Sequence, residues 1–147
     1  KLLNTLFSSK AGVAALILRV PVGLILAAHG AQKLFAWFGG YGLEGTGQWM
    51  ASIGLEPGYW LAMMAGSAEF FGGIALAIGL LTRPAAVVAG FTMLIAIFSV
   101  HISNGLFMAN NGYEYALTLL VVTVVLAIQG AGSFSLDNVL AKKLANK

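Results

Sequence analysis

The chain has 147 residues, of which 59% are apolar and 9% are charged, and its formal net charge is +3. A soluble domain carries about 25% charged residues, so an ordinary water-soluble fold is excluded, and lipid is the expected solvent of the apolar surface. The few Lys and Arg residues form no run that could follow a phosphate backbone, so nucleic acid is excluded as a partner; the absence of cysteine excludes disulfides and cysteine-ligated metal centres.

Four apolar segments qualify as membrane-spanning helices, which need about 20 residues each. They cover about residues 11–38, 59–81, 84–103 and 113–129, with turn residues between them. Pro84 stands in the first turn of the third segment, where its missing N–H costs nothing. The sequence therefore predicts an all-α fold with a single transmembrane domain, residues 1–147, arranged as an integral membrane four-helix bundle.

The basic residues predict the orientation of this bundle. Lys and Arg occur before the first segment, between the second and third, and after the fourth, whereas the loops 39–58 and 104–112 contain none. Because cytoplasmic loops are enriched in Lys and Arg, we expect both termini inside and these two loops outside. The three tryptophans, Trp37, Trp49 and Trp60, all fall at the outer boundary and are typical of lipid anchoring.

The first outer loop contains a short amphipathic stretch. We expect Thr46 to cap a helix over residues 48–53, which Gly54 ends. This helix is too short to span and has an apolar side, so it should lie along the membrane interface, where it could cover the outer helix ends.

Two opposite charges lie near the middle of the predicted spans. Arg19 and Glu69 are each about half a span from the membrane boundary, and charged groups at such depth need a partner. One interpretation is a structural ion pair between Arg19 and Glu69 that joins the first two helices. The other is functional, with Glu69 at the end of a path for protons or substrate.

Four further ionisable side chains lie near the predicted outer helix ends: His29, Lys33, His101 and Glu114. In an antiparallel bundle these ends share one level, so the four side chains should meet in an outward-facing cavity above Glu69. Lys33 and Glu114 could instead simply reach the lipid headgroups.

This set of side chains suits a quinone. His29, Lys33 and His101 are expected to contact the quinone head, because imidazole and ammonium groups donate to carbonyl oxygens. Glu69 and Glu114 are the expected catalytic proton carriers. Haem or a metal bound through His29 and His101 is a less favoured alternative, since no dense pattern of His, Asp and Glu accompanies them.

Several strings of residues, in this order and spacing, resemble the DoxX family of small membrane proteins. They include His29-Gly30-Ala31-Gln32-Lys33-Leu34, Glu69-Phe70-Phe71-Gly72-Gly73, Gly79-Leu80-Leu81-Thr82-Arg83 and Gly112-Tyr113-Glu114-Tyr115. The resemblance implies a four-helix protein of the bacterial cytoplasmic (inner) membrane, with several passes. It also implies an oxidoreductase or quinone-linked subunit, similar to a membrane subunit of thiosulfate:quinone oxidoreductase, whose catalytic partner is a separate protein.

The leading hypothesis is therefore a quinone-interacting membrane subunit of an oxidoreductase, with quinone, lipid and separate protein subunits or further copies of the chain as partners. A non-catalytic accessory or assembly subunit of a larger respiratory complex is the first alternative, because the chain contains no motif for a redox cofactor. A small-molecule permease is the second, although the two halves of the chain show no repeat.

Overall fold

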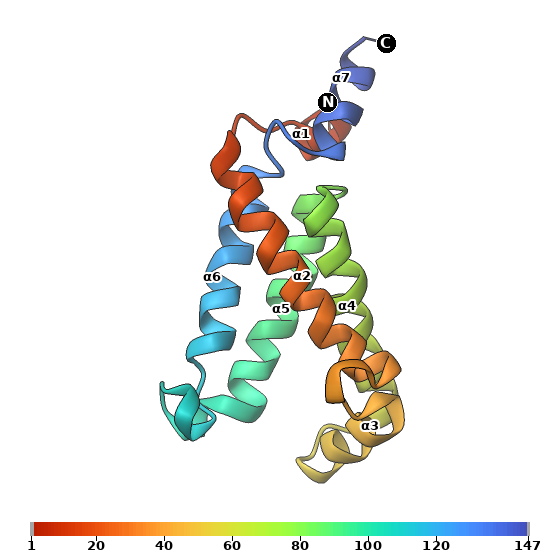
Figure 1. Cartoon of the computed structure of the whole chain (residues 1–147), viewed down its shortest axis with the longest axis vertical. Coiled ribbons are helices and arrows are strands. Elements are labelled where there is room, and N and C mark those ends of the chain that lie inside the picture. The colour runs from red at the N-terminus through yellow and green to blue at the C-terminus, as the bar shows by residue number, and fades with distance from the viewer. Residues whose placement is uncertain (1, 147) are drawn as a thin grey trace.

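A computed structural model describes residues 2–146 and is helical over most of this range (Figure 1). No strand occurs among these residues, so the predicted all-α class is confirmed. The α-helices are α1 (Leu2–Phe7), α2 (Val13–Phe35), α3 (Gly42–Ser52), α4 (Gly58–Ile78), α5 (Thr82–Ala96), α6 (Glu114–Gln129) and α7 (Leu136–Ala145). A π-helical turn, Ile97–His101, and a 3₁₀ turn, Ile102–Asn104, continue α5, and further 3₁₀ turns lie at Trp37–Gly39 and Met108–Asn110.

Three helical segments are long and apolar enough to cross a membrane: Val13–Phe35, Gly58–Ile78 and Thr82–Asn104. α6 is equally apolar but has only 16 residues, fewer than the about 20 that a full crossing needs. Large apolar side chains on these helices face outward, as at Phe91, which is 62% exposed, and Ile128, which is 73% exposed. Such a surface requires lipid, and the chain therefore has the character of a membrane protein.

The long helices form two pairs. α2 packs along α4, and α5 packs along α6, while α4 and α5 join the pairs and α2 touches α6 only briefly. Figure 1 shows that the pairs lie together near α1 and α7 and diverge toward α3. We call the end that carries α1, α7 and both chain termini the terminal end, and the opposite end the loop end.

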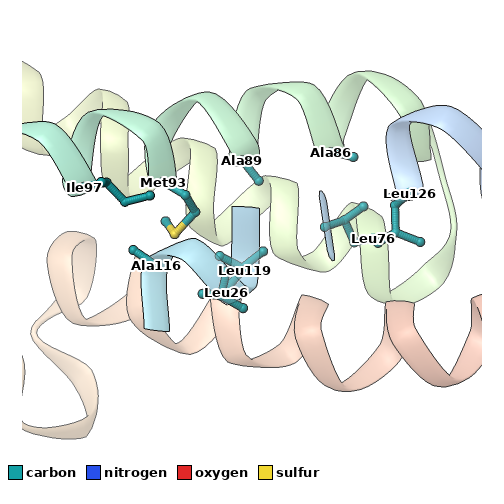
Figure 2. Close-up of a cluster of buried hydrophobic side chains, with 9 residues drawn as sticks. All are labelled: Leu26, Leu76, Ala86, Ala89, Met93, Ile97, Ala116, Leu119 and Leu126. Atoms are coloured by element: carbon teal, nitrogen blue, oxygen red, sulfur yellow. The ribbon is translucent and has the colours of Figure 1, made fainter. Parts of the chain in front are cut away.

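A core of apolar side chains fills the space between the two pairs. Leu26 of α2 and Leu76 of α4 are fully buried, and they meet Met93 of α5 and Leu119 of α6 (Figure 2). Many other core positions are alanines, such as Ala86 and Ala89, which let the helices approach closely.

Two charged side chains, one buried and one half-buried, tie the helices together at the terminal end. Asp137, at the start of α7, accepts hydrogen bonds from the N–H groups of Leu81 and Thr82 at 2.6 and 2.8 Å, so it caps the first turn of α5. Arg83 donates to Ala127 O at 3.0 Å and to Ser8 O at 2.9 Å, which joins α5 to the end of α6 and to the N-terminal segment. These bonds fix the helix ends opposite the loop end.

The first loop differs from its prediction at one end. The expected helix over residues 48–53 begins earlier, because α3 starts at Gly42, and Thr46 is a buried residue inside it rather than its cap. α3 begins at Gly42 because this residue has the positive φ of 71° that the entry into the helix needs. Gly54, with a φ of 90°, follows the end of α3 as expected.

Candidate functional site

The candidate site depends on direct contact between the backbones of α2 and α4. The contact uses two glycines on each helix: Gly23 and Gly30 on α2, and Gly66 and Gly73 on α4. A Cβ atom on Gly73 would lie 2.5 Å from Ala27 N, and one on Gly30 would lie 2.6 Å from Phe70 Cα. Because no side chain fits between these backbones, polar groups on the two helices come within hydrogen-bonding range.

An ion pair crosses this contact. Lys33 Nζ on α2 lies 2.9 Å from Glu69 Oε2 on α4. The Glu69 side chain is 4% exposed and that of Lys33 is 24% exposed, so the carboxylate is enclosed while the lysine reaches the surface. The second carboxylate oxygen, Glu69 Oε1, accepts no hydrogen bond from any described residue. Glu69 therefore keeps an oxygen free for a proton or a ligand.

A second polar contact joins α2 to α6. Tyr115 Oη lies 3.0 Å from His29 Nε2, and the centroids of the two rings are 5.4 Å apart. His29 precedes Lys33 by one helical turn, so both side chains lie on the same face of α2. Side chains from α2, α4 and α6 thus form one polar cluster: His29, Lys33, Glu69 and Tyr115.

An open pocket of about 440 Å³ lies beside this cluster at the loop end. It is lined by Gln32, Lys33, Gly39, Gly40, Tyr41, Thr46 and Trp49. We call it the Lys33 pocket. Its volume falls within the range of about 300–1,000 Å³ that is usual for small-molecule sites. Lys33 belongs to both the pocket wall and the ion pair, so it connects the pocket to the enclosed carboxylate.

The predicted ion pair between Arg19 and Glu69 is wrong. Arg19 is 2% exposed and donates to Leu76 O at 2.7 Å, Ala131 O at 2.5 Å and Phe134 O at 2.9 Å. The reason is that Arg19 lies beside the last turn of α4 and the segment between α6 and α7, and a guanidinium group offers five donors to the carbonyl oxygens there. Glu69 is instead paired with Lys33.

His101 and Glu114 do not join the polar cluster. His101 Nδ1 lies 2.9 Å from Asn111 O, and Glu114 Oε1 accepts from the Met108 N–H at 2.8 Å. Both side chains thus hold the loop between α5 and α6. No hydrogen bond or ring contact joins His29 to His101 in residues 2–146, and the described residues contain no group of three His, Cys, Asp or Glu side chains that could hold a metal ion.

Sequence reasoning missed Tyr115 and most of the Lys33 pocket. The signal for Tyr115 was its place directly after Glu114, where a polar ring at the start of a span can point into the bundle. Trp49 is one of the predicted lipid anchors, because aromatic residues at a membrane boundary usually have that role, and no signal distinguishes Tyr41 from such an anchor. The structure places both in the pocket wall.

The model of the DoxX family matches residues 14–102 of this chain. The chain belongs to the DoxX family. The matched region contains His29, Lys33 and Glu69, whereas Glu114 and Tyr115 lie beyond it.

Two bacterial relatives of similar length carry informative names. The Bacillus subtilis (strain 168) protein "Putative oxidoreductase CatD" is 34% identical over 125 residues, which is 85% of this chain and 85% of that protein. The Escherichia coli (strain K12) protein "Inner membrane protein YqjF" is 34% identical over 137 residues, which is 89% of this chain and 95% of that protein. No solved structure matches the chain. These similarities show that the chain is a membrane protein of the DoxX family.

Proposed function

We propose that this protein is a quinone-interacting membrane subunit of an oxidoreductase and that the quinone head binds in the Lys33 pocket. The observation that carries the proposal is the position of Lys33, which lines the pocket and bonds the enclosed Glu69. An ammonium group is a strong hydrogen-bond donor to a carbonyl oxygen. The name of the CatD relative, an oxidoreductase, supports this class of reaction.

The rest of the pocket suits an aromatic ring with two carbonyl groups. Tyr41 and Trp49 offer flat rings against which a quinone can stack, and such contacts contribute about 0.5–1.5 kcal/mol beyond their buried area. Gln32 and Thr46 supply further polar groups, although the Gln32 amide already donates to Phe38 O at 3.2 Å. Gln32 and Lys33 are adjacent on α2 and both line the pocket, so their polar groups can orient the ring.

The proposed reaction needs two electrons and two protons for each quinone that becomes a quinol. The electrons come from a separate redox protein, which makes this chain a subunit rather than a complete enzyme. Lys33 supplies a proton to a quinone oxygen, and Glu69 holds the lysine in place and exchanges protons with it. His29 and Glu69 stay in the site, whereas His101 and Glu114 are assigned to the loop.

The setting of this reaction is a bacterial cytoplasmic membrane crossed several times by the chain. The name of the YqjF relative, an inner membrane protein, supports this location. The absence of Lys and Arg from residues 39–58 supports a loop end that faces outward, with both termini in the cytoplasm. The Lys33 pocket then opens toward the periplasmic side.

Titration of the purified protein with a short-chain quinone analogue tests the proposal. Binding should quench tryptophan fluorescence, and Trp49→Phe should remove most of the quenching because Trp49 lines the pocket. Lys33→Met should weaken binding about tenfold, since a hydrogen bond from a charged donor contributes about 1.5 kcal/mol or more. Lys142→Met, on exposed α7, is the matched control and should bind like the wild type. Equal affinities for Lys33→Met and the wild type would refute the proposed site.

An accessory subunit is a second candidate because of an apolar groove between α5 and α6. The groove has a volume of about 330 Å³ and a floor that includes Gly90 and Thr123. It could receive an apolar segment of a larger complex. The same titration separates the two functions, because an accessory subunit has no reason to bind the quinone analogue at all.

A further inference from the structure

The hydrogen bond between Tyr115 and His29 is unusual for a hydroxyl group in this bundle. Thr92, Thr118 and Thr123 donate to carbonyl oxygens of their own helices, at 3.1, 2.7 and 2.8 Å. Such local bonds are the simple way to satisfy a hydroxyl within a membrane. Tyr115 instead reaches another helix and bonds an ionisable ring at 3.0 Å. A tyrosine hydroxyl lies too far from its own backbone to form such a local bond, so it needs a partner elsewhere, and here that partner is an ionisable ring.

His29 lies beside the Lys33–Glu69 pair because of the glycine contact described above. Gly30 touches the backbone of Phe70, so the residues immediately before them, His29 and Glu69, lie at the same level of the helix pair. Lys33 follows His29 by one turn on the same face. His29 does not line the Lys33 pocket, so its contribution to the site must pass through the ion pair.

The free nitrogen of His29 remains accessible. Among the described residues, the enclosed side-chain atoms without a hydrogen-bond partner are Thr82 Oγ1 and Arg83 Nε. His29 Nδ1 also has no partner there, but it is not one of these enclosed atoms, so it is partly exposed at the surface of the chain. A neutral imidazole has one donor and one acceptor nitrogen, and a partner on one nitrogen decides the state of the other. The hydrogen bond between Tyr115 Oη and His29 Nε2 can run in either direction; when Tyr115 donates to Nε2, the proton of His29 resides on Nδ1.

We propose that Tyr115 is a positioning residue of the proposed quinone site, where it holds His29 in the Nδ1–H form so that the imidazole exchanges protons with the Lys33–Glu69 pair. This inference rests on the proposed function. When Lys33 gives a proton to a reduced quinone oxygen, Glu69 passes to Lys33 the proton that it takes from Nδ1 of His29. As Nδ1 loses this proton, Nε2 of His29 takes the hydroxyl proton of Tyr115, and Tyr115 then recovers a proton from the aqueous phase. Each transfer moves one proton, and the electrons come from the separate redox protein.

Nitrogen-15 NMR of the histidine rings tests the inference without any ligand. The chain contains only two histidines, so the variant His101→Ala leaves His29 as the single signal. In this background, Tyr115→Phe should change the His29 signals from one tautomer to a mixture. Tyr113→Phe is the matched control, because it removes a hydroxyl two positions away that has no hydrogen-bond partner in the described chain, and it should change nothing. Glu69→Gln should also alter the His29 signals, whereas Glu114→Gln should not.

Proton uptake on binding of the quinone analogue is the second measurement, made by calorimetry in buffers with different heats of ionisation. The wild type should take up protons on binding, and Tyr115→Phe should lose most of that uptake while Tyr113→Phe retains it. If the His29 signals are the same in all variants, or if Tyr115→Phe keeps full proton uptake, the inference is overturned and the quinone site stands. If the wild type binds no quinone analogue, the proposed function fails, and the NMR result still decides whether Tyr115 sets the state of His29.

Discussion

Replacing Gly73 by alanine tests whether backbone contact between α2 and α4 supports the site. The new methyl group would lie against Gly23 O and 2.5 Å from Ala27 N, which are backbone atoms that cannot rotate away. Overpacking of this kind costs about 1–3 kcal/mol of stability. Gly72 is the matched control, because a methyl group there would meet only Ala85 O at 3.7 Å, an ordinary van der Waals distance.

The difference between the two variants isolates the packing cost. Both substitutions gain the same helix propensity, about 1 kcal/mol in water, so this contribution cancels. We expect Gly72→Ala to be as stable as the wild type or more stable, and Gly73→Ala to be less stable than Gly72→Ala by about 1–3 kcal/mol. The assay is unfolding of the purified protein by SDS in mixed micelles, followed by circular dichroism. Equal stability of the two variants would refute the close contact of the helices.

Three further predictions concern the charged groups and the orientation. Glu69→Gln should lower the free energy of unfolding by about 1.5–3 kcal/mol, because Lys33 loses its charged partner. The double variant Lys33→Met, Glu69→Met should recover much of this loss in the same SDS assay, because it leaves no unpaired charge. Asp137→Ala should cost about 0.5–2 kcal/mol through loss of the α5 cap, and unchanged stability would show that the cap contributes nothing. A cysteine that replaces the exposed Gln48 should react with an impermeant maleimide added outside intact cells, and a reporter fused to the C-terminus should lie in the cytoplasm. The reverse pattern would overturn the predicted orientation.

The fold was predictable because lipid imposes simple rules on a sequence. Backbone groups in hydrocarbon must bond within their own helix, so a long apolar segment has few alternatives. The long helices accordingly begin and end close to the predicted positions. The short α7 escaped prediction because its moderately polar sequence carries no membrane signal, and its place depends on Asp137 reaching α5.

The partners of the charged residues were less predictable. Depth along the helices made Arg19 the natural partner of Glu69, since both lie near the middle of their spans. The depth of a residue in its span does not show which helix ends lie beside it. Arg19 in fact donates to Leu76 O in the last turn of α4. Lys33 starts nearer the loop end, but its long side chain extends to Glu69 across the glycine contact. Only the three-dimensional arrangement reveals which of these two cations reaches the carboxylate.

The charged groups of this bundle differ in how completely their polar atoms are used, and that difference separates structural from functional roles. Arg19 donates to three carbonyl oxygens, and both oxygens of Asp137 accept backbone N–H groups. Groups so fully bonded cannot exchange protons or bind a ligand without loosening the fold. Glu69 and His29, by contrast, each keep one polar atom free. Lys33, the partner of Glu69, lines a pocket large enough for a quinone ring at the loop end, and the saturated charges hold the opposite end together. A protein that must keep protonatable groups in a membrane can do so at one end because the other end is fixed.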